Sequence, residues 1–354
     1  MIKAKIFFTK LFHSEHWPTF LFYAPLLPYF LYKAIRAKNL TLPLIVNPAI
    51  KYSGIGTESK SKTLQLLPKA YSPKSILILP ETEFNSVLKL LLKADILFPL
   101  IAKPDIGFRG YLVKKINNQT DLENYLKKNT IAIILQEYVG YEKEIGLFYY
   151  KIPEETKGKI TSVTLKKFIT VKGNGVDNLS KLILEDKRAF LYYKIFEKLH
   201  QEKFFNIPKK GEVIKLTVIG NHSKGTQFIN GNHLIDTELV HFLDKLTENI
   251  SGFYYGRFDI KYESLEKLKK GENFKVLELN GIISEPTHIY DSDKGNYFAS
   301  LKSIFNHWQI MNTIARKNHD DFNVSYPPLQ PSLKELSFLR KYSKKITRLN
   351  KTTI

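Results

Sequence analysis

The chain contains no cysteine. Without thiols it cannot use a cysteine nucleophile, bind zinc through thiolates, hold a cysteine-ligated iron–sulfur cluster or form disulfides. This absence agrees with a reducing compartment, so we expect a cytoplasmic protein. The sequence also lacks a Gly-x-Ser-x-Gly nucleophile elbow and internal repeats.

The aromatic stretch at residues 17–32 carries no charge, but its sixteen residues are fewer than the roughly 20 of a membrane-spanning helix. It contains three prolines and lacks an A-x-A-like cleavage site, so we expect no secretory signal. Two readings remain open: an interfacial element on an anionic membrane at its inner face, or a proline-bent helical hairpin packed on the body or on the second subunit of a homodimer. The basic residues that flank the stretch are Lys3, Lys5, Lys10, Lys33, Arg36 and Lys38.

Acidic residues are scarce relative to basic ones, and the formal net charge is +20. Residues 332–354 contain a single acid, Glu335, among seven basic residues with apolar residues interleaved. This pattern predicts a basic terminal helix, either solvated or in contact with an anionic partner. The aromatic stretch near the N-terminus favours a membrane over nucleic acid as that partner.

Polar residues that suit a hard cation alternate with apolar ones in two segments. Asp259 follows Arg257 by two residues, and Glu278 precedes Asn280 by two. Along a strand such residues share one face. Their oxygens form the ligand set that Mg²⁺ prefers, and Arg257 can meet the same phosphate. The alternative is two amphipathic strands with solvated carboxylates.

Upstream, residues 98–113 read as a strand, a glycine-containing turn and a second strand. Lys103 can neutralise phosphate charge, while Gly107 and Gly110, on either side of Arg109, let backbone N–H groups approach phosphate oxygens. An apolar strand at residues 131–139 follows, and then Glu144.

In this order the parts resemble the ATP-grasp superfamily, in particular carboxylate–amine ligases related to D-alanine:D-alanine ligase, over residues 59–289. The resemblance implies ATP and Mg²⁺ as cofactors, with two metal ions and Mn²⁺ as a substitute. It places Lys103 on the α-phosphate, residues 105–110 over the outer phosphates, and Arg257 on the transferred phosphate. An upstream nucleotide lysine maps to Lys62, with Lys60 as a competitor. It further implies an adenine hinge at Gln136, Glu137, Tyr138 and Val139, a ribose contact at Glu144, and metal ligands Asp259, Glu278 and Asn280.

The substrate end is less defined. The turn at residues 220–225 offers Lys224 to a transferred phosphoryl group and His222 as a proton acceptor for an amine, or as a hydrogen-bonding strut. His13, His16 and His233 have no partners at metal-ligand spacing in the sequence. The resemblance places an acceptor loop at Glu285, Thr287 and His288. Because this loop departs from the small-residue sequence of D-alanine-type ligases, we do not expect D-alanine dipeptide synthesis.

We predict an α+β protein with the ATP-grasp fold, in which two α+β lobes sandwich ATP, with an abbreviated N-terminal lobe and helical extensions at both ends. The expected divisions are residues 1–40, 41–95, 96–310 and 311–354, and the third comprises a small lobe at 96–150 and a larger one at 151–310. Expected elements include a strand at 43–47 and helices at 60–67, 81–92 and 121–128.

The expected reaction joins a carboxylate to an amine through an acyl phosphate, with release of ADP and phosphate. Its substrates would be small molecules or lipid-linked compounds. Two alternatives remain: an ATP-grasp kinase or phosphotransferase, and a membrane- or nucleic-acid-binding module with a vestigial ATP site.

Overall fold

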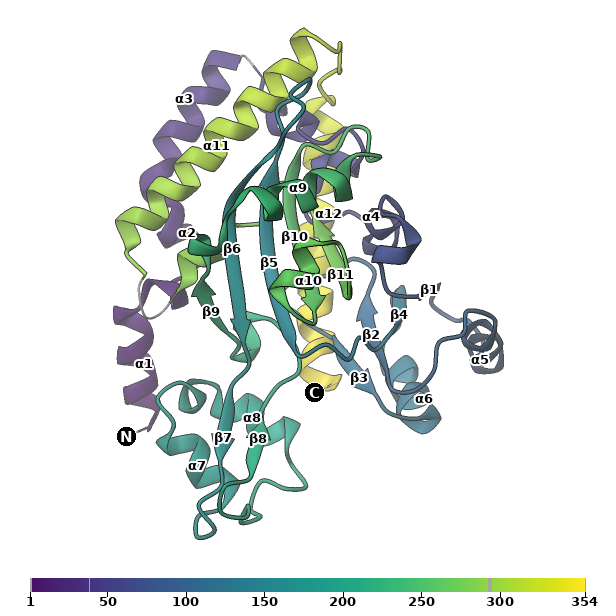
Figure 1. The fold of residues 1–354 in the computed structure, drawn as a ribbon, viewed down its shortest axis with the longest axis vertical. Helices are drawn as coiled ribbons and strands as arrows, with labels where there is room; N and C mark the ends of the chain where they lie inside the picture. Colours follow the sequence, from purple (N-terminus) through teal and green to yellow (C-terminus); the bar gives the residue numbers. More distant parts are fainter. Residues whose placement is uncertain (1, 38, 292–294, 354) are drawn as a thin grey trace.

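The computed structural model describes residues 2–37, 39–291 and 295–353 (Figure 1). Lys38 and the side chains of Lys3 and Lys5 lie outside the described part of the chain. Helices and antiparallel sheets are both present, as expected for an α+β fold. Two sheets form the two lobes, and helices from both ends of the sequence pack along them (Figure 1).

The smaller lobe is a four-stranded antiparallel sheet in the order β1-β4-β2-β3. Its apolar core includes Val87, Leu91, Leu122, Tyr125 and Ile346, which come from three helices. The strands are β1 (Ser75–Ile78), β2 (Leu100–Pro104), β3 (Lys114–Ile116) and β4 (Ile133–Glu137), and the helices are α5 (Phe84–Lys93), α6 (Gln119–Lys128) and α12 (Leu329–Thr353).

The larger lobe is a five-stranded antiparallel sheet in the order β11-β10-β5-β6-β9. Along β5, Ile145, Leu147 and Tyr149 pack into the core beneath α9, while Glu144 and Gly146 alternate with them and face the opposite side. The strands are β5 (Lys143–Tyr150), β6 (Lys159–Lys167), β9 (Gln227–Asn230), β10 (Tyr255–Tyr262) and β11 (Phe274–Asn280), and the helices on this core are α4 (Lys60–Gln65), α9 (Thr237–Thr247) and α10 (Leu265–Lys269).

A third apolar cluster lies below the large sheet in Figure 1. It joins the two-stranded sheet of β7 (Thr170–Lys172) and β8 (Val213–Lys215) to α7 (Leu179–Glu185) and α8 (Tyr193–Leu199). Asn178 caps α7 by accepting a hydrogen bond from the backbone N–H of Lys181.

The N-terminal arm, residues 2–37, consists of α1 (Ile2–Phe12), α2 (Thr19–Tyr23) and α3 (Leu27–Ala37). α2 and α3 lie beside α11 (Tyr297–Asp320), and α1 lies beyond the end of that helix (Figure 1). Phe22 and Leu26 pack against Ile289 and Ile304, while Ile6 of α1 packs on the third cluster. The expected packing on the body is thus present for one side of the arm. Within residues 2–37, 39–291 and 295–353, no helix is both long and apolar enough to span a bilayer.

Two expected divisions of the chain and one expected strand differ from the structure. Residues 41–95 do not form one lobe, because β1 and α5 complete the small sheet while α4 packs on the large one. The strand expected at residues 43–47 is wrong: Leu42–Ile45 is a 3-10 helix with Pro43 in its first turn. β5, expected in the small lobe, is the central strand of the large sheet.

The C-terminal segment is helical, as the sequence predicts, but α12 is not a free tail. Ile346 is fully buried in the core of the small lobe. Asn350 accepts a hydrogen bond from the backbone N–H of Leu112, and Glu335 pairs with Lys51 at 2.6 Å. α12 therefore connects the small lobe to the segment that precedes α4.

Candidate functional site

A cleft of about 1290 Å³ lies between the two lobes. Its walls come from the cleft-facing side of the large sheet, the inner strands of the small sheet, the turn at residues 219–223 and the N-terminal arm. Asp259, Glu278, Asn280 and Arg257 all line this space, as does Lys103 from the facing lobe.

The strand register brings the expected metal ligands together. Across β10 and β11, Asp259 is paired with Glu278 and Arg257 with Asn280, with a register shift immediately after Asp259. Asn280 Nδ2 lies 3.4 Å from an oxygen of Asp259. Two carboxylates and an amide therefore share one face of the sheet, which supports the hypothesis of an oxygen-only cation site over that of solvated carboxylates.

Cationic side chains neutralise these carboxylates. Arg257 makes a two-pronged contact with Asp259, at 3.2 and 3.1 Å. The ammonium of Lys166 lies 3.1 Å from Asp259 and 2.6 Å from Glu144. Burial alone would raise the pKa of Asp259, but Arg257 and Lys166 lower it to about 2. Asp259 is consequently a carboxylate at neutral pH.

The upstream lysine in the cleft is Lys60. Its ammonium pairs with Glu278, whereas Lys62 is exposed and does not line the cleft. The start of α4 determines which of the two lysines faces the cleft, because hydrogen bonds hold the first turn of the helix in place. Ser59 caps α4, and Asp105 accepts from both the Ser59 hydroxyl and the Ser61 backbone N–H at 2.9 Å. Asp105 therefore holds α4 and is not part of a free phosphate loop.

Lys103 leaves β2 toward the large lobe. Its ammonium donates to Gln136 Oε1 and to the carbonyl of Leu277, both at 3.0 Å. Burial lowers the pKa of Lys103 to about 8, although Glu278 opposes this shift. The side-chain nitrogen of Gln136 is buried and finds no hydrogen-bond partner among the described residues. An unsatisfied buried donor beside a lysine is what a bound polar ligand can satisfy.

The segment expected to meet adenine lines the same end of the cleft. The backbone N–H of Glu137 donates to the carbonyl of Lys74, and the carbonyl of Val139 accepts from the ammonium of Lys261 at 3.0 Å. The Tyr138 ring lies beneath the ammonium groups of Lys115 and Lys261, 4.3 and 5.2 Å from the ring centre. Glu144, expected on the ribose, also lines the cleft, where it pairs with Lys166 and lies against Gly220.

The glycine-containing turn closes onto the large lobe. Arg109 and Gly110 adopt left-handed backbone conformations, with φ of 55° and 64°. The carbonyl of Arg109 accepts a hydrogen bond from Ser223 at 2.7 Å, and a side chain at Gly110 would meet Asn221. Gly107, Arg109 and Gly110 all line the cleft. The turn thus covers the cleft from the small lobe.

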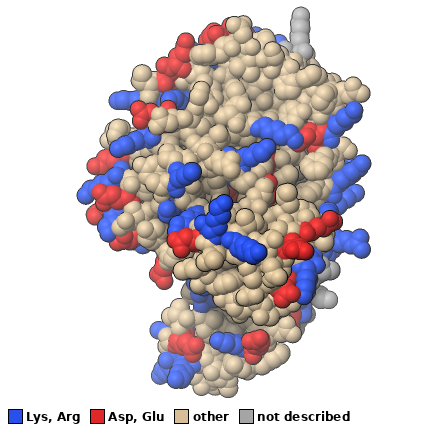
Figure 2. Space-filling view, turned by 90° about the vertical axis from the view of Figure 1, so that its right-hand side faces the viewer, with Lys and Arg blue, Asp and Glu red and all other residues tan. Residues whose placement is uncertain are grey.

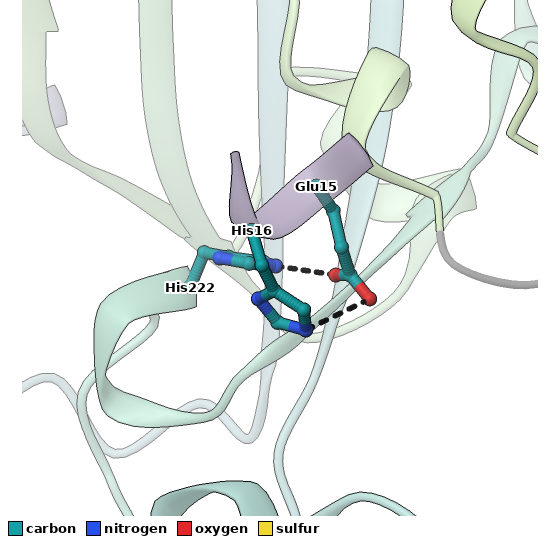
Figure 3. A group of neighbouring side chains, drawn as sticks. All are labelled: Glu15, His16 and His222. Carbon is teal, nitrogen blue, oxygen red and sulfur yellow. Dashed lines mark hydrogen bonds and ion pairs between the residues drawn. The ribbon is translucent and has the colours of Figure 1, made fainter. Parts of the chain in front are cut away.

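His222 lines the cleft and is tied to the N-terminal arm. Its Nε2 lies 2.5 Å from Glu15, whose two carboxylate oxygens also accept from Arg188 at 3.2 Å (Figure 3). Burial would raise the pKa of Glu15, but the hydrogen bond from His222 and the charge of Arg188 lower it to about 2. An ionised Glu15 only accepts, so Nε2 of His222 is the donor in this hydrogen bond.

His16, assigned no role from the sequence, completes this cluster. Its Nε2 lies 3.4 Å from the second oxygen of Glu15 and makes no hydrogen bond within the described residues (Figure 3). Glutamate and histidine are metal-ligand types. Arg188 nevertheless donates to both oxygens of Glu15, which favours a structural ion pair over a metal-ion site.

Two residues expected at the substrate end do not line the cleft. Lys224 is 5% exposed, and burial lowers its pKa to about 8. His288 bonds Ser162 at 2.7 Å behind the acceptor loop. Thr287 and Glu285 do reach the cleft. The carboxylate of Glu285 accepts from Tyr290 at 2.7 Å and from Tyr23 of the arm, so it is engaged by tyrosines.

No protein-family model and no curated protein matches the chain. Solved structures do. A bifunctional glutathione synthetase from Pasteurella multocida has a TM-score of 0.36 and 16% identity, over 70% of this chain and 36% of its own. The VanG D-Ala:D-Ser ligase from Enterococcus faecalis has a TM-score of 0.42 and 13% identity, over 75% of this chain and 63% of its own. The D-alanine–D-alanine ligase from Bacillus anthracis has a TM-score of 0.41 and 14% identity, over 77% of this chain and 72% of its own.

The chain therefore spans about a third of the glutathione synthetase and less than two thirds of the VanG ligase. Each of these likenesses has a TM-score below 0.5 and carries no argument about this chain.

Proposed function

We propose that the cleft binds ATP with a divalent cation and that the protein joins a carboxylate to an amine. The observation that carries this proposal is the register of β10 and β11, which sets Asp259, Glu278 and Asn280 beside Arg257 on the cleft wall. Oxygen ligands for a hard cation next to cations for phosphate are the pairing that nucleotide chemistry needs.

The nucleotide would take over ion pairs that the side chains now make with one another. Lys60, Lys103, Lys166 and Arg257 come from both lobes and converge on the cleft. Their present partners are Asp259, Glu278 and Glu144, together with Gln136. Asp259, Glu278 and Asn280 would hold Mg²⁺, which would shield phosphate charge, and the four cationic side chains would pair with phosphate oxygens.

In the proposed reaction, a carboxylate oxygen of the substrate attacks the γ-phosphorus. The bond to the bridging oxygen breaks and ADP leaves. The amine nitrogen then attacks the acyl carbon, the bond to phosphate breaks, and the amine loses a proton. His222 would receive that proton through Nδ1, the ring nitrogen that does not contact Glu15. Positioning and charge stabilisation, not covalent catalysis by the protein, would lower the barrier.

The test uses a mixture of amino acids and other small acids with the purified protein, ATP and Mg²⁺, and mass spectrometry of the products. An amide product with ADP, and transfer of heavy oxygen from a labelled carboxylate to the released phosphate, would support the ligase. A phosphoester without free phosphate would identify a phosphotransferase instead. Absence of ATP binding by calorimetry would overturn both and leave the binding-module alternative.

A further inference from the structure

The N-terminal arm carries large apolar side chains on the side that faces away from the body. Phe22 and Leu26 anchor the arm on α11, and Trp17 contacts Tyr297 with ring centres 5.2 Å apart. The outward side chains remain uncovered in the described structure. The outer apolar face, as we call it, consists of Phe7, Phe8, Leu11, Phe12, Phe20, Leu21, Leu27, Leu31, Tyr32 and Ile35, each at least half exposed.

These residues follow the helical repeat and are not scattered. Leu27, Leu31 and Ile35 recur every four residues on α3, so they form one stripe. On α1, Phe7 with Leu11 and Phe8 with Phe12 form two adjacent stripes at the same spacing. Apolar stripes that stay exposed to water along one arm of a protein usually mark a docking site. The aromatic content and the amphipathic spacing fit insertion into a lipid headgroup region.

The charge around the outer apolar face favours an anionic partner. The first 57 residues contain one acid, Glu15, and its carboxylate is buried against Arg188 and His222. Exposed charges on the arm are basic, at Lys10 and Arg36. By contrast, the face on the opposite flank of the molecule carries interspersed acidic and basic side chains (Figure 2). Docking two copies through the arm would bring together chains of net charge +20, whereas an anionic surface complements it.

We propose that the outer apolar face docks on an anionic lipid membrane and opens the acceptor end of the cleft toward it. The arm contributes to both surfaces. Ile6, Lys10, Trp17 and Phe22 line the cleft, and Tyr23 holds the acceptor-loop residue Glu285. If the proposed function holds, on which this part rests, one substrate is an amphiphile whose apolar portion stays at the interface while its polar head enters the cleft.

The first test measures flotation of the full-length protein with vesicles of phosphatidylcholine, with and without phosphatidylserine. The variant Phe12→Ser/Phe20→Ser/Ile35→Ser removes apolar groups that are 79%, 71% and 74% exposed, so the core is spared. The matched control Leu92→Ser/Val176→Ser/Phe205→Ser changes side chains that are 82%, 74% and 72% exposed elsewhere. Phe22 is left unchanged because it is buried on α11.

We expect the unmodified protein and the control to float with anionic vesicles at low salt, and the arm variant to lose binding by about tenfold or more. Salt should weaken binding of the unmodified protein without abolishing it. Failure of the unmodified protein to float, or equal losses in both variants, would overturn the proposal. So would a dimer, seen by light scattering, that only the arm variant dissociates.

Flotation needs no ATP turnover, so this test is independent of the proposed function. If the protein floats but forms no amide with any acceptor, only the ligase is in error. If it ligates soluble acceptors yet never binds vesicles, only the membrane proposal is.

Discussion

Glu278 lies between two lysines that come from different lobes. Lys60 pairs with it directly and Lys103 lies near enough to lower its pKa, although burial opposes them. A carboxylate so placed can hold a cation only while it stays charged. Its side chain therefore offers the most direct probe of the metal site.

We expect Glu278→Gln to reduce Mg²⁺-dependent ATP turnover by about a hundredfold or more, because the amide keeps the shape but loses the charge that binds the cation. Glu272→Gln, at an exposed position just before β11, serves as the control. Turnover is measured by ADP release, and folding by circular dichroism. Near-normal turnover with an unchanged Mg²⁺ requirement would remove Glu278 from the site.

His222 can be separated from the phosphoryl-transfer step by the choice of acceptor. Hydroxylamine is unprotonated at pH 7 and attacks acyl phosphates directly, whereas an alkylamine is an ammonium ion that must lose a proton before it can attack. His222→Gln should therefore lower amide formation by about 10²-fold or more and leave hydroxamate formation and ATP affinity nearly unchanged. The exposed His233→Gln is the control. Equal losses for both acceptors would assign His222 a structural role only.

His307 illustrates a buried neutral histidine outside the cleft. Its Nδ1 lies 2.8 Å from the Tyr255 hydroxyl, and burial lowers its pKa to about 3. Below its ordinary value of 6.5, the unfolded chain binds a proton that the folded chain refuses. Stability contributed by this group is therefore present above pH 6.5 and lost as pH falls toward 3. His16 and His288, with pKa values lowered to about 4, act in the same sense.

Between pH 6.5 and 5, His307→Gln should reduce the slope of unfolding free energy against pH by up to about 1.4 kcal/mol per pH unit, the contribution of one histidine that takes up its proton only in the unfolded chain. Urea titrations at several pH values provide the measurement. The idea fails if His307→Gln has the same slope as the parent protein.

At the scale of elements, local pattern and distant packing decide different things. The alternation of polar and apolar residues identifies β10 and β11 and the face they share, because side chains alternate with period two whatever the strand pairs with. That β5 lies beside β10 is set by contacts across more than a hundred residues, and its own sequence does not record them. The choice between Lys60 and Lys62 likewise depends on Asp105, which is distant in the chain.

Some site residues carried a signal that pattern analysis could have used. On β6, Ser162, Thr164 and Lys166 alternate toward one face, and Thr164 and Lys166 contact Thr287 and Asp259 there. The pairing of His222 with Glu15 had no such signal, since 207 residues separate them. Only the folded arm brings that carboxylate to the cleft.

α12 is not the solvated tail that the sequence allowed, because it packs into the core of the small lobe. We expect Ile346→Ala to destabilise the small lobe by about 2–4 kcal/mol, because Ile346 is fully buried and its removal leaves a cavity. Leu336→Ala on the same helix, where the side chain is 49% exposed, should cost less than about 1 kcal/mol. Denaturant unfolding of both variants tests this. Equal effects would mean that α12 does not complete the core.

At the scale of the whole molecule, the excess of positive charge acts both on folding and on the proposed ligand. A net charge of +20 repels itself in the compact state, and the lysines of the cleft add to this when no anion is bound. Salt should therefore raise the unfolding temperature of the protein alone, since it screens that repulsion. The same screening should weaken the binding of a nucleotide that the charge attracts.

ATP with Mg²⁺ at about a hundred times its dissociation constant should add about 2.7 kcal/mol of stability, which for a chain of this size raises the unfolding temperature by several degrees. We expect that increment to shrink as sodium chloride increases, while the baseline rises. Scanning fluorimetry across a salt series measures both. In Glu278→Gln the part of the increment that depends on Mg²⁺ should disappear, which ties the global effect to the metal ligands. An ATP increment that ignores both salt and Mg²⁺ would place the nucleotide elsewhere, because neither the cations nor the carboxylates of this cleft would then be holding it.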